Sequence, residues 1–212
     1  MLFYHEIFTS IQGESTDAGV PTTFIRLFGC PYRCIFCDQP QMKSQKRRIS
    51  LANLIYRVER ESPKYVCITG GEPLIQDDVY PLIYELVNLG YKVSVETSGC
   101  VPIEKDPYDR SFKYVMDIKC PCSGISEKNV FGNLANLQKH DEVKFVIATR
   151  KDYDFFKEVI NKYPTPAKIL LSPMFDADGS PVIGQKLTEW VLHDKLPDVK
   201  IGIQMHKILN VK

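Results

Sequence analysis

The sequence predicts an α/β protein that folds as a partial, open parallel β/α barrel of about six strands. Short apolar segments alternate with amphipathic segments of about ten to fifteen residues, which is the pattern of βαβ units in a parallel sheet. A closed eight-stranded barrel usually takes ~250 residues, whereas this chain has 212. That length corresponds to one domain, which we expect to span residues 1–212.

The elements follow from apolar patterning along the chain. The expected strands are apolar segments, at 22–29, 64–73, 91–99, 113–121, 142–149, 167–174 and 200–210. The expected helices are amphipathic segments, at 50–62, 77–90, 129–141, 152–164 and 184–197. Ser50 is a suitable N-cap for its helix, and Gly90 a suitable C-terminal cap. The basic stretch 43–50 has no apolar periodicity, so we expect a solvated loop there.

Composition limits the class of protein. Hydrophobic residues make up 44% of the chain and charged residues 25%, with a formal net charge of +1. A net charge this small gives no electrostatic field that would attract nucleic acid or a membrane surface. No apolar run is long enough to span a bilayer. Residues 1–10 show no signal-peptide pattern, so we expect a cytoplasmic protein. Seven cysteines, in a compartment where disulfides are rare, favour metal or catalytic use of some thiols.

Three cysteines, Cys30, Cys34 and Cys37, follow the first expected strand with C-x3-C-x2-C spacing. A structural zinc site needs four ligands and usually two paired clusters, but Cys120 and Cys122 form only a C-x-C pair. A four-iron cluster commonly uses four thiolates. Three thiolates would leave one iron open to an outside ligand, so the spacing favours a catalytic iron–sulfur cluster.

A second motif, TGGEP at 69–73, follows the next expected strand, and its glycines allow close approach of a ligand to the backbone. The two motifs together resemble the radical S-adenosylmethionine (SAM) superfamily. The resemblance implies that Cys30, Cys34 and Cys37 hold a [4Fe–4S] cluster, that SAM chelates the open iron, and that its cleavage gives a 5′-deoxyadenosyl radical. The SAM contacts it implies are residues of these motifs and of later strand ends: Phe36, Cys37, Asp38, Gly70, Gly71, Glu72, Glu96, Asp117, Lys119 and Ser172.

The substrate is indicated by residues outside the cysteine loop. The stretch I-Q-G-E at 11–14, Arg26 four residues before Cys30, and Q-x-H at 204–206 resemble the 7-carboxy-7-deazaguanine synthase family over nearly the whole chain. The resemblance implies a carbon–nitrogen lyase of queuosine or archaeosine biosynthesis. Such an enzyme converts 6-carboxy-5,6,7,8-tetrahydropterin to 7-carboxy-7-deazaguanine: a hydrogen leaves C6, the ring contracts, the hydrogen returns and ammonia is released.

The family resemblance also implies a set of substrate contacts. The loop 11–13 matches the family loop that reads the amide edge of the pterin through its backbone. Arg26 matches the arginine that pairs with the substrate carboxylate, a contact suited to a planar guanidinium. For His206 an ordinary core histidine remains the alternative. The implied substrate residues are Ile11, Gln12, Gly13, Glu14, Arg26, Thr69 and His206.

Two positions depart from the family pattern. Gln39 stands where the family has a Thr or Ser that binds magnesium, and an amide oxygen is a longer, neutral ligand. Asp117 stands where relatives often carry a serine, while Lys119 keeps the family lysine. Four further cysteines have no matching role: Cys67, Cys100, Cys120 and Cys122.

The expected partners are a pterin substrate and an electron donor such as flavodoxin or ferredoxin, with no nucleic acid and no membrane. An open sheet edge favours pairing with a second subunit, and the family implies a homodimer.

Two alternative functions stay open. A glycyl-radical-enzyme activase would share the cysteine and GGEP motifs, but it has no use for I-Q-G-E with Arg26. A non-catalytic iron–sulfur or metal scaffold would leave TGGEP unexplained.

Overall fold

A single curved sheet organises the protein. The computed structural model describes residues 1–37, 39, 46–105, 112–176, 179–196 and 198–212. Over these residues nine strands form one sheet in the order β3-β1-β2-β4-β5-β6-β7-β8-β9. From β2 onward the neighbours in this order run parallel, whereas β1 pairs antiparallel with both β2 and β3. The open, mostly parallel β/α architecture expected from the sequence is confirmed, with nine described strands in place of about six.

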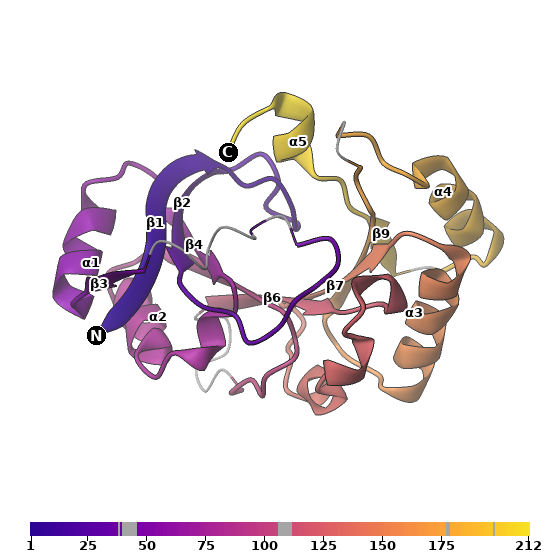
Figure 1. Cartoon of the computed structure of the whole chain (residues 1–212), viewed down its shortest axis with the longest axis horizontal. Coiled ribbons are helices and arrows are strands. Elements are labelled where there is room, and N and C mark those ends of the chain that lie inside the picture. The colour runs from indigo at the N-terminus through magenta and orange to yellow at the C-terminus, as the bar shows by residue number, and fades with distance from the viewer. Residues whose placement is uncertain (38, 40–45, 106–111, 177–178, 197) are drawn as a thin grey trace.

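The strands, in chain order, are β1 (Leu2–Ile11), β2 (Pro21–Leu27), β3 (Arg47–Ile49), β4 (Tyr65–Gly70), β5 (Lys92–Thr97), β6 (Phe112–Ile118), β7 (Glu142–Ile147), β8 (Lys168–Pro173) and β9 (Val199–Ile201). The helices are α1 (Leu51–Glu59), α2 (Val79–Asn88), α3 (Arg150–Lys162), α4 (Gly184–His193) and α5 (Met205–Leu209). Figure 1 shows the sheet as an open arc, with α1 and α2 outside one half and α3 and α4 outside the other. The concave side of the arc is therefore left free of these four helices.

The helices form where the apolar stripes predicted them. Ser50 caps α1 by accepting a hydrogen bond from the Asn53 backbone N–H, and Leu54 and Val58 are buried beneath it. Thr149 and Asp152 form a capping box at the start of α3, which satisfies two backbone donors that the first turn leaves open. Burial of one apolar stripe per helix against the convex face builds the core.

Successive side chains of each strand point to opposite faces of the sheet. In β7, Val143 and Phe145 are fully buried in the core, whereas Lys144 between them faces a cavity on the concave side. In β6, Met116 is buried in the core while Asp117 lines the same cavity. Because side chains alternate along a strand, the residues between the core positions face the cavity, and charged ones among them, such as Asp117 and Lys144, make the concave face partly polar. Such a face is suited to binding a ligand.

The N-terminal segment differs from the expectation that 22–29 is the first strand. Residues Leu2–Ile11 form β1, which pairs with β2 from Tyr4 opposite Leu27 to Ile11 opposite Pro21. Part of the basic stretch 43–50, expected as a loop, forms β3, and Arg47–Ile49 pairs with β1; residues 43–45 lie outside the described part. An antiparallel hairpin thus extends the parallel sheet at one edge.

The segment 129–141 is not the expected α-helix. It contains the 3₁₀ turn Phe131–Ala135 and otherwise irregular backbone. The side-chain amides of Asn129, Asn133 and Asn136 all bind backbone groups of neighbouring segments. Asparagine competes with helical hydrogen bonding in this way, so the apolar pattern alone was misleading here.

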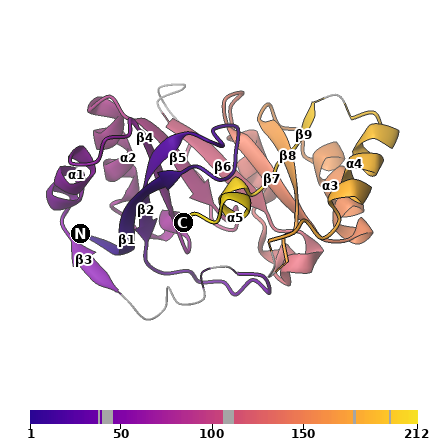
Figure 2. The same ribbon diagram turned by 90° about the horizontal axis from the view of Figure 1, so that it is seen from above.

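The segment 200–210 is not one continuous strand. It begins as the end of β9, which stops at Ile201, and continues as the short helix α5. The Met205 backbone N–H donates to the Gly13 carbonyl at 2.8 Å. Figure 2 shows α5 and the C-terminus lying over the sheet and close to β2. The tail therefore leaves one edge of the sheet and packs against the β1–β2 hairpin near the other.

Candidate active site

A cavity of about 870 Å³ occupies the concave side of the sheet. Strand residues from β1, β2 and β4 to β8 line it, together with the cysteine loop after β2 and residues of α5. In an α/β sheet of this kind, ligands bind at the carboxyl ends of the strands, where loops and strand-end side chains converge. A cavity of this size is large enough for two small organic ligands side by side.

The structure brings most of the expected site residues to this one cavity. Those that line it are Ile11, Gln12, Gly13, Glu14, Arg26, Cys30, Cys34, Phe36, Cys37, Gln39, Thr69, Gly70, Gly71, Glu96, Asp117, Lys119, Ser172 and His206. Glu72 is buried away from the cavity, and Asp38 lies outside the described residues. Residues more than 190 positions apart in the chain thus share one site. Their roles as ligands of the cofactor or substrate remain predictions.

The three cysteines of the C-x3-C-x2-C motif are free thiols that face the cavity. Cys30 and Cys37 are exposed and Cys34 is half-buried. Burial raises the pKa of Cys30 and Cys34, and their thiols are therefore proton-bearing in the absence of a metal. In the described part of the chain no group of three His, Cys, Asp or Glu side chains converges as around a single metal ion. Three thiols that face one cavity fit the three-cysteine ligation expected of a [4Fe–4S] cluster, which takes one thiolate per iron.

The two glycines of TGGEP pack directly on the start of the cysteine loop. A Cβ on Gly70 would lie 2.4 Å from the Leu27 carbonyl oxygen, and one on Gly71 would lie 2.3 Å from the Gly29 carbonyl oxygen. The Glu72 backbone N–H donates to the same Gly29 carbonyl at 2.9 Å. Only glycine permits this approach, so the glycines hold the cysteine loop against the end of β4.

Glu72 is a structural anchor in this arrangement. Its carboxylate is fully buried and accepts hydrogen bonds from the Leu74 N–H, the Thr97 hydroxyl at 2.8 Å, and the Ser98 N–H at 2.7 Å. From the sequence we expected the Glu72 carboxylate to accept a hydrogen bond from the ammonium group of the cofactor. In the structure the carboxylate ties the turn after β4 to the end of β5, where buried donors satisfy it. The contact with an ammonium group of the cofactor stays a prediction.

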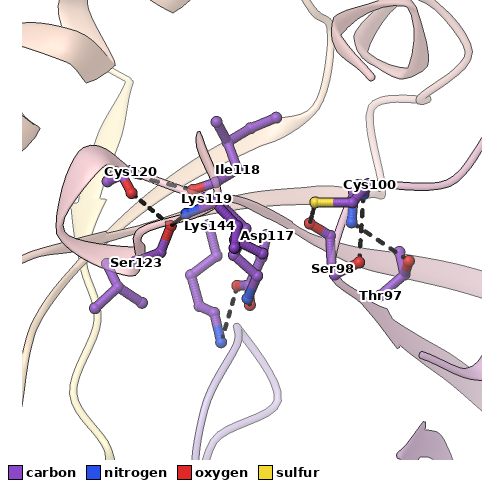
Figure 3. A network of polar contacts seen from close by, with 12 residues as sticks. Thr97, Ser98, Cys100, Asp117, Ile118, Lys119, Cys120, Ser123 and Lys144 are labelled. Carbon is purple, nitrogen blue, oxygen red and sulfur yellow. Dashed lines mark hydrogen bonds and ion pairs between the residues drawn. The ribbon is translucent and has the colours of Figure 1, made fainter. Parts of the chain in front are cut away.

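Two lysines and one aspartate meet where the end of β6 lies beside the middle of β7. Lys119 Nζ lies 2.5 Å from Asp117 Oδ2, and Lys144 Nζ lies 3.2 Å from Asp117 Oδ1. Figure 3 shows Lys144 extending beside Asp117. Burial acts to raise the pKa of Asp117, but the two ammonium groups outweigh it and lower that pKa. Asp117 is therefore ionised at neutral pH.

The I-Q-G-E loop closes the cavity opposite the cysteines. Gln12 is 3% exposed, and its amide donates to Glu96 at 3.3 Å. Glu14 pairs with Lys144 and also accepts a hydrogen bond from the Gln204 amide. A Cβ on Gly13 would lie 2.0 Å from a ring nitrogen of His206. The hairpin loop and the C-terminal helix α5 are therefore fitted to each other, and His206 is a half-buried cavity residue and not a core histidine.

Arg26 on β2 faces the cavity with 15% of its side chain exposed. Its Nε donates to Glu6 at 3.0 Å, and its guanidinium carbon lies 5.7 Å from the centre of the Phe8 ring. Lys212 Nζ pairs with the second oxygen of Glu6. Arg26 and Lys212 thus share one carboxylate, and their guanidinium and ammonium groups can attract an anionic ligand.

Several cavity residues escaped the sequence analysis, including Tyr32, Lys144 and Phe175. Lys144 carried a usable signal, because it is a charged residue flanked on both sides by apolar residues of its strand. Tyr32 donates to the Cys100 carbonyl at 2.6 Å and so ties the cysteine loop to the turn after β5. That contact joins segments far apart in the chain and has no local sequence pattern.

The four cysteines without an expected role are not among the residues that line the cavity. Cys67 and Cys120 are buried, and Cys120 Sγ lies 3.8 Å from the Ile118 carbonyl. Burial raises the pKa of Cys100 to about 11 and that of Cys122 to about 12. Figure 3 shows Cys100 and Cys120 on the turns that follow β5 and β6. These thiols are protonated at neutral pH and behave as core residues.

Comparison with known proteins gives concordant results. The family model of the radical SAM superfamily matches residues 24–117. A 7-carboxy-7-deazaguanine synthase of Methanospirillum hungatei is 39% identical over 97% of this chain and 84% of that protein. One from Koribacter versatilis is 39% identical over 96% of this chain and 95% of that protein. The crystal structure of QueE from Escherichia coli superposes with a TM-score of 0.77 at 23% identity, covering 97% of this chain and 94% of that one.

Among the described residues, no helix is both long enough and apolar enough to cross a membrane.

Proposed function

The chain belongs to the 7-carboxy-7-deazaguanine synthase family of radical SAM enzymes, and from this we propose how its cavity divides between cofactor and substrate. The reaction of the family is the conversion of 6-carboxy-5,6,7,8-tetrahydropterin to 7-carboxy-7-deazaguanine with release of ammonia. The observation that carries the proposal is the single cavity onto which both the cysteine motif and the I-Q-G-E loop open. The one continuous sheet supports treating residues 1–212 as a single functional unit.

The cofactor side is assigned to the loops after β2, β4, β5 and β6. The [4Fe–4S] cluster and SAM supply a 5′-deoxyadenosyl radical when bound. Cys30, Cys34 and Cys37 would hold the cluster, since their thiols face the cavity. The Gly70–Gly71 backbone would approach the methionyl part of SAM, and Asp117 would accept hydrogen bonds from ribose hydroxyls. The protein's task on this side is to orient SAM and to exclude water.

The substrate side is assigned to the β1–β2 hairpin, β2 and α5. The Gln12–Gly13 backbone would read the pterin amide edge, and His206 would cover it, since it packs directly on Gly13. Arg26 would bind the substrate carboxylate through the terminal nitrogens of its guanidinium, while its Nε stays fixed by Glu6. A cation held rigidly by a neighbouring carboxylate and ring places the substrate in one orientation.

For magnesium, Gln39 is a cavity residue with one neutral amide oxygen to offer. Magnesium keeps several waters and usually takes only one or two protein ligands. We infer that Gln39 would supply one ligand, and that weak binding would follow from the missing anionic or hydroxyl donor. If so, Gln39→Thr lowers the magnesium concentration needed for half-maximal turnover. Turnover that is unaffected by removal of magnesium with EDTA would reject the site.

The remaining proposed partners are an electron donor and a second copy of the chain. An electron donor such as flavodoxin or ferredoxin would reduce the cluster, and the seven free thiols suit a reducing cytoplasm. A homodimer is supported by exposed apolar side chains on and just after the edge strand β9, at Ile201 and Ile203. Solvent-exposed apolar residues beside an open sheet edge favour pairing.

The deciding experiment is anaerobic turnover of the reconstituted enzyme with dithionite, SAM, magnesium and 6-carboxytetrahydropterin. Mass spectrometry should detect 7-carboxy-7-deazaguanine, and Cys34→Ala should abolish it because one cluster ligand is lost. Cys67→Ala is the matched control, since that buried thiol is on β4 and should leave product formation in place. SAM cleavage without any deazaguanine would retain the superfamily and reject the substrate.

A further inference from the structure

Lys144 is a buried cation of the cavity to which neither the cofactor nor the substrate set assigns a role. It projects from the middle of β7 onto the concave face, and 13% of its side chain is exposed. Its neighbours in the strand, Val143 and Phe145, are fully buried on the opposite face. Its position in the pleat therefore directs the ammonium group into the cavity (Figure 3).

The ammonium of Lys144 connects the two halves of the site. It pairs with Asp117 Oδ1 at 3.2 Å on one side and with Glu14 on the other. Beyond Asp117 lies Lys119, at 2.5 Å from Oδ2, and beyond Glu14 lies the Gln204 amide, at 2.5 Å from Oε1. An unbroken series of contacts thus runs from the expected SAM residues to the hairpin loop and the C-terminal segment.

The charge balance makes Lys144 necessary to this arrangement. Burial tends to lower the pKa of Lys144, but Asp117, Glu14 and Glu96 outweigh it and hold that pKa well above the ordinary value. The group is charged at neutral pH. These three carboxylates face two ammonium groups, those of Lys119 and Lys144. Removing one ammonium would leave buried like charges uncompensated, and such charges move apart or take up protons.

We propose that Lys144 is a positioning residue that fixes the substrate side of the cavity relative to the SAM side, by holding Glu14 and Asp117 on one ammonium group. The inference rests on the proposed function. Hydrogen transfer between two bound molecules requires their reacting carbons in contact, and a misplacement of about 1 Å can cost ~100-fold in rate. A residue that bridges the two subsites therefore governs how often SAM cleavage leads to product.

The test compares reconstituted wild type with Lys144→Met, which keeps a long side chain and removes the charge. Product and 5′-deoxyadenosine are both quantified under anaerobic turnover with SAM and 6-carboxytetrahydropterin. We expect product formation to fall about 100-fold, while SAM cleavage falls much less. The ratio of deoxyadenosine to product should then rise at least about tenfold. Lys144→Arg keeps the charge and should recover part of the coupling.

Lys113 supplies a matched control on the neighbouring strand β6. It is similarly buried, at 15% side-chain exposure, and pairs with the carboxylates of Asp17 and Glu142 at 2.6 and 2.7 Å. It is not among the residues that line the cavity. Lys113→Met should therefore lower stability as much as Lys144→Met does, yet leave the ratio of deoxyadenosine to product unchanged.

Two results would overturn the proposal. In one, Lys144→Met lowers SAM cleavage and product formation by the same factor. In the other, Lys113→Met raises the ratio as much as Lys144→Met does. If Lys144→Met does not retain its iron, the ratio measured for Lys144→Gln, which keeps a polar side chain but removes the charge, decides the matter: a wild-type ratio in that variant contradicts the proposal. Failure of the proposed function looks different, because wild type itself would then yield no deazaguanine.

Discussion

At the scale of single residues, the position of the cysteine loop depends on a close contact between its backbone and the turn after β4. Gly71 lies against Gly29 and Cys30, and the Glu72 N–H is bonded to the Gly29 carbonyl. The atoms that a side chain would meet are a carbonyl oxygen and a Cβ, neither of which can rotate away. The position of the first cluster ligand is thus set by the absence of a side chain on the neighbouring turn.

Gly71→Ala should displace the cysteine loop, because the new Cβ would lie 2.3 Å from the Gly29 oxygen and 2.6 Å from the Cys30 Cβ. We expect a loss of about 1–3 kcal/mol in stability and a clear fall in bound iron. Iron content and cluster absorbance after anaerobic reconstitution measure the effect. Gly132→Ala is the control, since an added Cβ there meets nothing within 4 Å. Equal iron in both variants would contradict this account.

At the scale of elements, irregular segments are held by side-chain amides. Asn133 is 2% exposed; it accepts from the Ile103 N–H at 3.1 Å and donates to the Gly99 and Val101 carbonyls at 3.3 and 2.8 Å. One buried amide therefore shapes the whole turn 99–103 after β5. That turn carries Cys100, whose carbonyl anchors Tyr32 of the cysteine loop.

Asn133→Ala should loosen this turn, since the buried Ile103 N–H and the Val101 carbonyl lose a partner, while the Gly99 carbonyl keeps the Val130 N–H. An unsatisfied buried group costs about 1–3 kcal/mol. Faster amide hydrogen exchange across 99–103 is the expected signature, together with a lower free energy of unfolding in urea. Asn136→Ala serves for comparison, because that amide makes a 3.2 Å bond to the Ile103 carbonyl and is less buried. The interpretation fails if both variants exchange at the same rate.

At the scale of the whole molecule, ion pairs on the concave face join the hairpin to the far strands. Glu14 binds Lys144 of β7, and Asp17 binds Lys113 of β6. The hairpin loop thus crosses the open side of the arc. Because these pairs are largely buried, salt screens them less than it screens surface pairs. Both contribute to stability, but only the Glu14–Lys144 pair lines the cavity and so contributes to the shape of the site.

The stability of the protein should fall in acid for this reason. Burial acts to raise the pKa of Glu14, but Lys144 outweighs it and lowers that pKa from 4.5, and the pKa of Asp117 lies below 3.8. The unfolded chain therefore binds more protons in acid. The stabilisation is complete above these ordinary values and is lost as pH falls through the lower folded-state values. Lys144 acts in the opposite sense, and its contribution is lost only as pH rises beyond 10.5.

Urea unfolding of the cluster-free protein between pH 2 and 7 measures this dependence. Glu14→Gln removes one titrating group, so the acid slope should become shallower by up to ~1.4 kcal/mol per pH unit. Glu85→Gln, at an exposed position of α2, should keep the wild-type slope. A wild-type slope in Glu14→Gln would show that the ion pair with Lys144 does not hold the hairpin.

The sequence by itself determined the alternating α/β architecture, the cysteine motif and the family. These properties are local: apolar periodicity, short spacings and turn residues can be read within a few positions. It also supplied most of the cavity residues, through motifs at strand ends. It missed the strand β1, because the segment 1–11 pairs with a strand beyond an intervening loop. It also misassigned 129–141, because asparagine bonds to distant backbone outweigh an apolar pattern.

Only the tertiary structure decided how the site is held together. The burial of Glu72 against the end of β5, the packing of His206 on Gly13, and the bridge of Lys144 between Glu14 and Asp117 all join residues distant in the chain. No spacing in the sequence encodes such contacts, because they depend on the curvature of the sheet and on which strands become neighbours. The chemistry of the motifs is thus local, whereas their alignment is a property of the folded chain.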